Sequence, residues 1–233
     1  MRKIKLENEK YYHVFNRGAN KQEIFLDEKD YFRFLNNIWE FNNELGYNQR
    51  RFLKDKNRIN KAETPGVPNF GTPGVFNNPK KIFSKYPKLI EILTYNLLPN
   101  HYHFILKQLV DNGIEKFINK LGIGYAKYFN NKYNHSGVIF QGRFKAYLVS
   151  SENKLSWLSA YVNCNYEIHK LGDAEKWQFS SYQDYFDLRK GNLCNKNIVL
   201  KLFKNNIKEY EKYCELVVKE LQEIKESQKI FLE

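Results

Sequence analysis

The sequence predicts an α+β fold: an antiparallel sheet with the split βαβ order of a ferredoxin-like domain, covered by helices and followed by a C-terminal helical arm. Three observations predict it. Segments rich in β-branched and aromatic residues alternate with segments of helical spacing, and the first six run strand, helix, strand, strand, helix, strand. In addition, 42% of the 233 residues are hydrophobic, which is enough to bury one substantial core.

The first two elements precede a long stretch without periodic pattern. YYHVFNRG (11–18) has the β-forming residues of a strand and ends at Gly18. Asp27 is a helix-capping residue, and apolar residues then recur at helical spacing to about residue 43. Residues 44–84 are rich in Asn, Lys and Gly and contain the tetrapeptide TPGV twice, so they predict an exposed loop insertion.

The remaining elements follow this insertion. The sequence predicts strands at 89–98, 101–109 and 138–149 and helices at 114–133 and 151–172. The helix at 151–172 is a seventh element, so it has to lie outside the six-element order. A lysine- and glutamate-rich amphipathic pattern from residue 196 predicts a C-terminal arm, and we expect one domain over 1–190 with an extension over 191–233.

The charge balance predicts a polyanionic partner. Lys and Arg total 38 against 26 Asp and Glu, a formal net charge of +12, and 16% of residues are aromatic. Positive charge attracts phosphates and aromatic rings stack on unpaired bases, which favours single-stranded nucleic acid. An AT-rich genome that favours lysine, asparagine and tyrosine codons explains the same numbers, so composition alone leaves both interpretations open.

Other features exclude several classes of protein. No stretch approaches the roughly 18 apolar residues of a membrane span, and the N-terminal residues lack the apolar stretch of a signal peptide. We therefore expect a cytoplasmic protein without a membrane partner. Cys164, Cys194 and Cys214 are an odd number without close spacing, which supports neither a disulfide framework nor a zinc ribbon.

The segment YNLLPNHYHFIL (95–106) raises the question of chemistry. His101 and His103 alternate in a predicted strand, so they project to one face while Tyr102 points away into the core. Neighbouring imidazoles can chelate a divalent cation, but the spacing also fits a pair of histidines at the exposed face of a strand without a metal. The helix at 151–172 offers the missing groups, because Tyr161 and Asn165 lie one turn apart on the same helix face.

Four segments together resemble a known family. LPNHYHFIL (98–106), GVIFQGRFKAYLV (137–149), AYVNCNYEIHKLG (160–172) and WQFSSYQDY (177–185) occur in the order found in the single-tyrosine HUH transposases, named for their His-hydrophobic-His motif. The chain most resembles the REP-associated tyrosine transposase branch, also described as IS-element-like transposases, over about residues 10–190. Tyr166 departs from the pattern, since relatives usually carry proline there.

The resemblance implies a role for each matching residue. His101, His103 and Asn165 match the residues that hold a divalent metal, Mg²⁺ or Mn²⁺, and Tyr161 matches the nucleophile. Members of this family cleave single-stranded DNA beside small hairpins, which leaves the 5′ phosphate on the tyrosine and a free 3′ hydroxyl. Dimers occur in the wider superfamily, so the resemblance also makes a homodimer an expectation for this chain.

Further residues and alternatives stay open at this point. Arg17, Arg143 and Lys145 are candidates for DNA contact because they are expected in strands or turns near the sheet. Tyr125 and Tyr128 are rival nucleophiles, although neither has a polar partner four residues on. A non-catalytic hairpin DNA- or RNA-binding module and a metal-dependent nuclease that uses water are the alternatives to a transposase.

Overall fold

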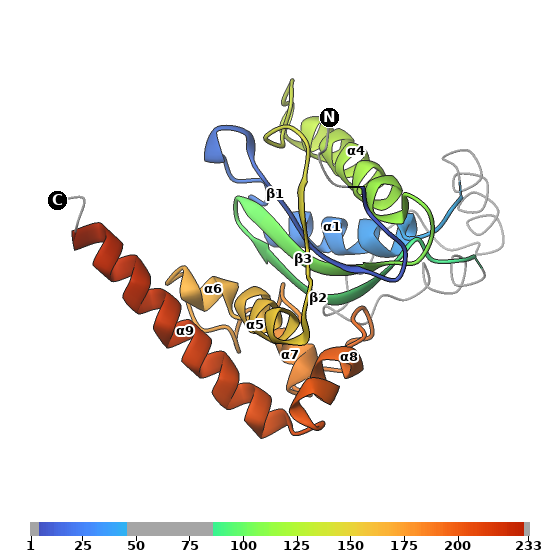
Figure 1. Cartoon of the computed structure of the whole chain (residues 1–233). Coiled ribbons are helices and arrows are strands. Elements are labelled where there is room, and N and C mark those ends of the chain that lie inside the picture. Colours follow the sequence, from blue (N-terminus) through green and yellow to red (C-terminus); the bar gives the residue numbers. More distant parts are fainter. Residues whose placement is uncertain (1–4, 46–85, 231–233) are drawn as a thin grey trace.

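A four-stranded antiparallel sheet forms the centre of the computed structural model, which describes residues 5–45 and 86–230 (Figure 1). Its strands are β1 (Tyr11–Arg17), β2 (Ile90–Leu98), β3 (His101–Gln108) and β4 (Lys145–Leu148). They are ordered β2-β3-β1-β4, and every neighbouring pair is antiparallel. This is the order of a split βαβ fold, so the predicted fold class is confirmed. Residues 46–84 of the predicted insertion lie outside the described residues.

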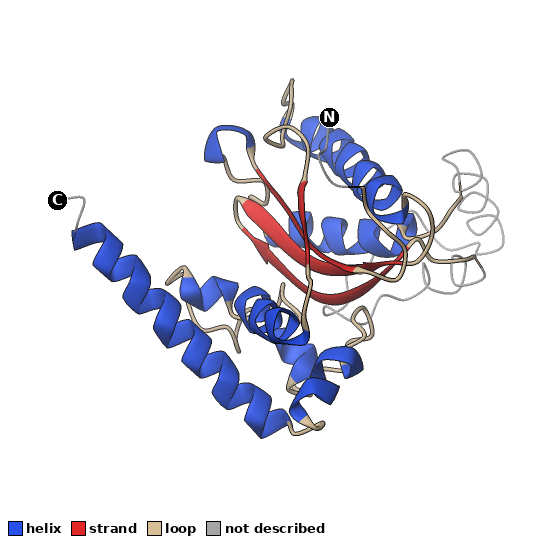
Figure 2. Ribbon diagram, viewed as in Figure 1, coloured by secondary structure: helices blue, strands red, loops and turns tan. Residues whose placement is uncertain are grey.

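Two helices cover one face of the sheet. They are α1 (Glu28–Phe41) and α4 (Gly113–Tyr133), which pack against each other and against the sheet (Figure 2). The predicted cap of α1 is confirmed, since Asp27 accepts a hydrogen bond from the main-chain N–H of Asp30 at 3.1 Å. Tyr102 is only 2% exposed in this layer, where its ring contacts Phe34, so it points into the core as predicted.

A second helical layer covers the opposite face. It contains α5 (Glu152–Asn163), α6 (Asn165–Ile168), α7 (Tyr182–Tyr185), α8 (Asn197–Leu200) and α9 (Ile207–Ile230). Short 3-10 turns occur at Ala19–Lys21 and Lys201–Phe203. The seventh predicted element therefore has a place: α5 lies against β2 and β3, and α9 lies against α5 and α6 (Figure 1). The boundary at residue 190 stays a prediction.

The predicted strand at 138–149 is wrong at its N-terminal end. Only Lys145–Leu148 pairs with β1, and before it a single isolated bridge joins Phe140 to Gly18. Gly142 has a φ of +63°, a left-handed conformation that interrupts an extended strand. Glycine supplies the turn at this point, and the strand begins only after it.

The predicted helix at 151–172 is interrupted and ends early. Cys164, with φ −95° and ψ 10°, separates α5 from α6. The helix then ends at Ile168, because Lys170 takes the left-handed conformation with φ +56°. Across residues 5–45 and 86–230, no helix is both long and apolar enough to span a membrane.

Candidate active site on the histidine face of the sheet

His101 and His103 project together from β3 toward α5. We call this side of the sheet, which carries His13, His101 and His103, the histidine face. The ring centroids of His101 and His103 lie 5.1 Å apart with an interplanar angle of 83°. The prediction that the two imidazoles share one face is therefore confirmed.

His13 joins this pair from the neighbouring strand. The register of β1 against β3 places Phe15 opposite His103 and His13 opposite Ile105. Nε2 of His13 lies 2.9 Å from Nδ1 of His103, and both side chains are buried. Because this hydrogen bond occupies Nδ1, Nε2 is the nitrogen of His103 that is left to bind a metal.

His101 is oriented by the turn that precedes it. Its Nδ1 lies 2.5 Å from Oδ1 of Asn100, and an amide oxygen only accepts hydrogen bonds, so Nδ1 carries the proton. The lone pair of His101 is then on Nε2, the same atom that is left on His103. His169, the residue after the end of α6, approaches from the helical layer with a ring centroid 5.4 Å from that of His101.

Tyr161 on α5 lies against the histidine face. Its ring meets that of His103 edge-on at 5.5 Å and that of His13 at 6.0 Å. Trp157, one helical turn earlier, stacks on Tyr161 at 5.5 Å with an interplanar angle of 3°. Tyr161 is thus the tyrosine that the second layer brings to the histidines, as the helix spacing predicts.

Asn165 supplies the observation that tests a metal site. The side chain is fully buried at the start of α6, and neither its Oδ1 nor its Nδ2 has a hydrogen-bond partner among the described residues. Its amide nevertheless lies close to His101 and Tyr161. It acts to raise the pKa of His101 and to lower the pKa of Tyr161, in each case against the larger effect of burial. A buried amide without a partner is costly, and an oxygen ligand to a cation beside two imidazoles would satisfy it.

The donor set depends on this amide. Within the described ranges, no group of three or more His, Cys, Asp or Glu side chains is placed to hold a metal ion. Two imidazole nitrogens and one amide oxygen are therefore the donors that fit a divalent cation here. Such a mixed set suits Mg²⁺ or Mn²⁺, with the imidazoles favouring Mn²⁺ as the tighter binder.

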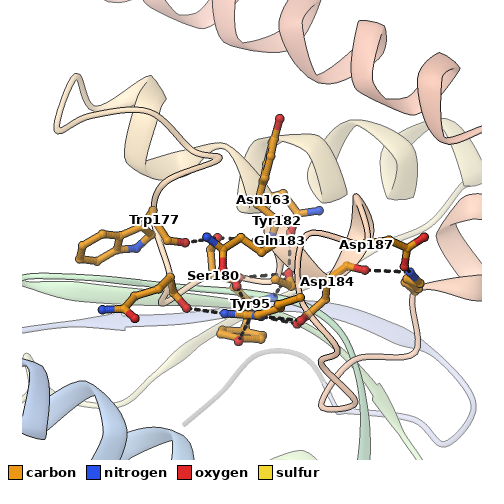
Figure 3. A network of polar contacts seen from close by, with 12 residues as sticks. Tyr95, Asn163, Trp177, Ser180, Tyr182, Gln183, Asp184 and Asp187 are labelled. Atoms are coloured by element: carbon orange, nitrogen blue, oxygen red, sulfur yellow. Dashed lines mark hydrogen bonds and ion pairs between the residues drawn. The ribbon is translucent and has the colours of Figure 1, made fainter. Parts of the chain in front are cut away.

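A buried polar network fixes α5 over the sheet. Asn96 on β2, opposite His103, donates from Nδ2 to the last two main-chain carbonyl oxygens of α5 at 2.8 and 3.2 Å. The hydroxyl of Ser181 donates to Oδ1 of Asn163 and accepts from the main-chain N–H of Tyr95 at 2.9 Å. Asn163 and Tyr95 are drawn with this network in Figure 3.

Arg189 anchors the same network through several hydrogen bonds. Its Nε donates to Asp184 at 2.6 Å and its Nη2 to the hydroxyl of Tyr95 at 2.7 Å, and its side chain is only 12% exposed. A further bond reaches the carbonyl oxygen of Gln178 at 2.5 Å. The segment WQFSSYQDY (177–185) is therefore bonded both to β2, through Tyr95, and to α5, the helix that carries Tyr161, through Asn163 (Figure 3).

Burial keeps the histidines neutral. It lowers the pKa of His101 to about 4, with a smaller effect from the charge of His169. Burial likewise lowers the pKa of His13 to about 4, assisted by Lys154, and holds the pKa of His103 well below its usual range. Neutral imidazole is the form that binds metals, so the site has its ligands ready at neutral pH.

Tyr161, unlike the histidines, has to change its protonation state in order to react. Burial raises the pKa of its phenol, and the nearby amide of Asn165 only partly offsets this effect. The hydroxyl therefore carries its proton at neutral pH, and a nucleophilic role requires that proton to leave.

Strand register places two of the three predicted DNA contacts beside this face. Arg17 is the last residue of β1 and the cross-strand neighbour of His101, and Lys145 on β4 is the neighbour of Phe15. Arg143 is exposed but lies in the bend before β4 and not in a strand, because the turn at Gly142 delays the strand.

The rival tyrosines lie on the other side of the sheet. Tyr125 is fully buried in the layer of α1 and α4, and its hydroxyl donates to the carbonyl oxygen of Ile24. Tyr128 donates to the carboxylate of Asp30 at 2.9 Å. Neither hydroxyl contacts the histidine face.

Sequence spacing missed His13 and His169. Each stands alone in its segment, so no local pattern marks it. The signal lay in the pairing of strands: His13 alternates with Phe15 in β1, and β1 runs antiparallel beside β3. Four of the five histidines of the chain, His13, His101, His103 and His169, gather at this site.

One comparison with known proteins, a family model, covers the segment that carries the histidine and tyrosine motifs. A solved structure described as the REP-associated tyrosine transposase bound to a REP hairpin is 13% identical, with a TM-score of 0.45 over 80% of this chain and 84% of that chain. No curated protein matches the sequence. Residues 77–165 match the family model described as Transposase IS200 like. This segment, which includes His101, His103, Tyr161 and Asn165, is therefore similar to the IS200-like transposases, in agreement with the resemblance of the sequence to the single-tyrosine HUH transposases.

Proposed function

We propose that the protein is a metal-dependent single-stranded DNA endonuclease and strand transferase that cleaves near hairpin repeats through a 5′-phosphotyrosine intermediate. One observation carries the proposal. Tyr161, the neutral pair His101 and His103, and the unpartnered amide of Asn165 meet at one place on the histidine face. A nucleophile beside three metal donors is the arrangement that phosphodiester cleavage requires.

Tyr161 is the proposed nucleophile. Its oxygen attacks phosphorus and loses its proton, the bond to the 3′ oxygen breaks, and that oxygen takes up a proton to become a free 3′ hydroxyl. Because phenolate is a good leaving group, the 3′ hydroxyl can reverse the step or another strand end can be joined. Trp157 stacks along the ring and keeps it directed at the histidine face.

The proposed metal ligands are His101, His103 and Asn165. A bound Mg²⁺ or Mn²⁺ would neutralise charge on the phosphate and assist loss of the phenol proton. His13 and Asn100 would keep Nε2 of each imidazole available by bonding to Nδ1.

The substrate class follows from the family resemblance and from charge. Single-stranded DNA next to a hairpin is what relatives of this kind cleave, and the formal net charge of +12 suits a polyanion. Arg17, Arg143 and Lys145 are the proposed phosphate contacts. Arg17 and Lys145 pair with residues of the histidine face, and Arg143 is exposed two residues before Lys145.

A covalent-adduct assay tests the proposal. Hairpin DNA with a labelled single-stranded flank is incubated with the protein and Mn²⁺ and then separated on a denaturing gel. We expect a labelled protein band that disappears in Tyr161→Phe and persists in Tyr213→Phe, which removes a half-buried hydroxyl on α9.

The other outcomes identify the alternatives. Cleavage without a labelled protein band would indicate a nuclease that uses water. Binding of the hairpin without cleavage at any Mn²⁺ concentration would indicate a non-catalytic binding module.

A further inference from the structure

Aromatic rings form a row across the histidine face, from the edge of the sheet to the proposed metal site. Tyr147 on β4 stacks on Phe15 of β1, with ring centroids 5.9 Å apart and an interplanar angle of 21°. Phe15 in turn stacks on His103 at 5.3 Å and 28°. The row therefore links an outer strand to a residue that contacts Tyr161.

Tyr147 differs from every other Phe, Tyr and Trp residue in the described parts of the chain. It is 52% exposed, whereas the side chains of all other described Phe, Tyr and Trp residues are buried or half-buried. A single exposed apolar side chain is common on protein surfaces. Tyr147 is distinctive because its ring continues a stacked series that leads into a candidate active site.

Positive charge accompanies this row. Nζ of Lys145 lies 5.9 Å from the centroid of the Phe15 ring. Arg17 ends β1 next to His101, and Arg143 is exposed just before β4. A surface for single-stranded nucleic acid has two components, aromatic rings that stack on the bases and neighbouring cations that bind the phosphates.

We propose that Tyr147 and Phe15 form a stacking platform for an unpaired base of single-stranded DNA entering the site from the β4 edge. The inference rests on the proposed function for its ligand, and it adds a subsite to it. Neither the histidine pair nor Tyr161 belongs to the platform, so base binding there requires no metal and no cleavage.

The test compares two strands of equal charge in the presence of EDTA. One is a fluorescein-labelled thymidine oligomer of about ten nucleotides, and the other is an abasic strand of the same length. Fluorescence anisotropy gives the affinity of the wild-type protein, Tyr147→Ala and Tyr147→Phe for each strand. Leu148→Ala is the matched control, because Leu148 is 38% exposed on the same strand but points to the opposite face.

We expect the wild type and Tyr147→Phe to prefer the strand that carries bases. Tyr147→Ala should bind it about five- to hundredfold more weakly and bind the abasic strand as the wild type does, because only stacking is lost. Leu148→Ala should match the wild type on both strands.

Two results would overturn the platform. An equal loss for both strands would mean that Tyr147 supports local structure or phosphate binding. Unchanged DNA affinities with reduced self-association in sedimentation would mean that the β4 edge is a contact between copies. Since the assay contains no metal, an inactive enzyme would leave its outcome unaffected.

Discussion

At the scale of single residues, a substitution of Asn165 distinguishes between two roles of its amide, as a metal ligand or as a purely structural group. A buried amide without partners costs about 1–3 kcal/mol, so Asn165→Leu should leave the free energy of unfolding in EDTA unchanged or higher. The same change should weaken Mn²⁺ binding, measured by calorimetry, at least about tenfold. Marked destabilisation with unaltered Mn²⁺ affinity would instead assign Asn165 a purely structural role.

The low pKa of His101 gives a second prediction at this scale. Because burial lowers this pKa to about 4, the imidazole stays neutral when the pH falls from 7 to 5.5. Mn²⁺ affinity should therefore change little over this range. Histidines with an ordinary pKa of about 6.5 would each weaken it about tenfold per pH unit below that value. A steep loss of affinity near pH 6 would show that the site is more hydrated than its burial indicates.

At the scale of secondary-structure elements, α5 is fixed by the side chain of Asn163. It is fully buried and bonded to Ser181 and to the hydroxyl of Tyr210, the latter at 2.9 Å. Asn163→Ala should lower the free energy of unfolding by about 2–3 kcal/mol, because it leaves two buried hydroxyls short of a partner.

Urea denaturation measures this difference. Asn153→Ala is the matched control, since Asn153 is exposed on the same helix and its loss should cost nothing. Equal effects of the two changes would contradict the assignment of the network as the support of α5.

The elements that the sequence predicts well are those whose pattern is local. The β-forming residues of β1, the short apolar runs of β2 and β3 and the helical spacing in α1 and α4 gave their type and approximate bounds. The errors occur where one backbone conformation decides the outcome, at Gly142 before β4 and at Cys164 and Lys170 in the tyrosine helix. The spacing of apolar residues does not predict a change in the backbone dihedral angles of a single residue.

The candidate site was predictable in part for the same reason. His101, His103, Tyr161 and Asn165 could be found because each pair is close in sequence and shares a strand or a helix face. His13 and the platform of Phe15 and Tyr147 depend on which strands become neighbours and in which register. That information is tertiary, and no single segment contains it.

At the scale of the whole molecule, the buried histidines make stability depend on pH. The unfolded chain binds their protons near pH 6.5, whereas His13 and His101 in the folded protein do so near pH 4. Between these values the unfolded state holds more protons, so the free energy of unfolding falls as the pH falls. The expected slope is about 1.4 kcal/mol per pH unit for each histidine.

Urea denaturation between about pH 7 and pH 5 measures this slope. Above about pH 7 these histidines should no longer change the free energy of unfolding with the pH. His135→Ala should leave the slope unchanged, because His135 lies away from the site and bonds to Asn130. A flat profile would contradict the burial of the histidine face.

Tandem mass spectrometry of the digested adduct shows whether Tyr161 becomes covalently joined to DNA. The protein is incubated with hairpin DNA and Mn²⁺, both polymers are digested, and the peptide that carries a nucleotide is sequenced. We expect a 5′-phosphate linked to Tyr161. A nucleotide on Tyr125, Tyr128 or Tyr147, or cleaved DNA with no modified peptide, would contradict it.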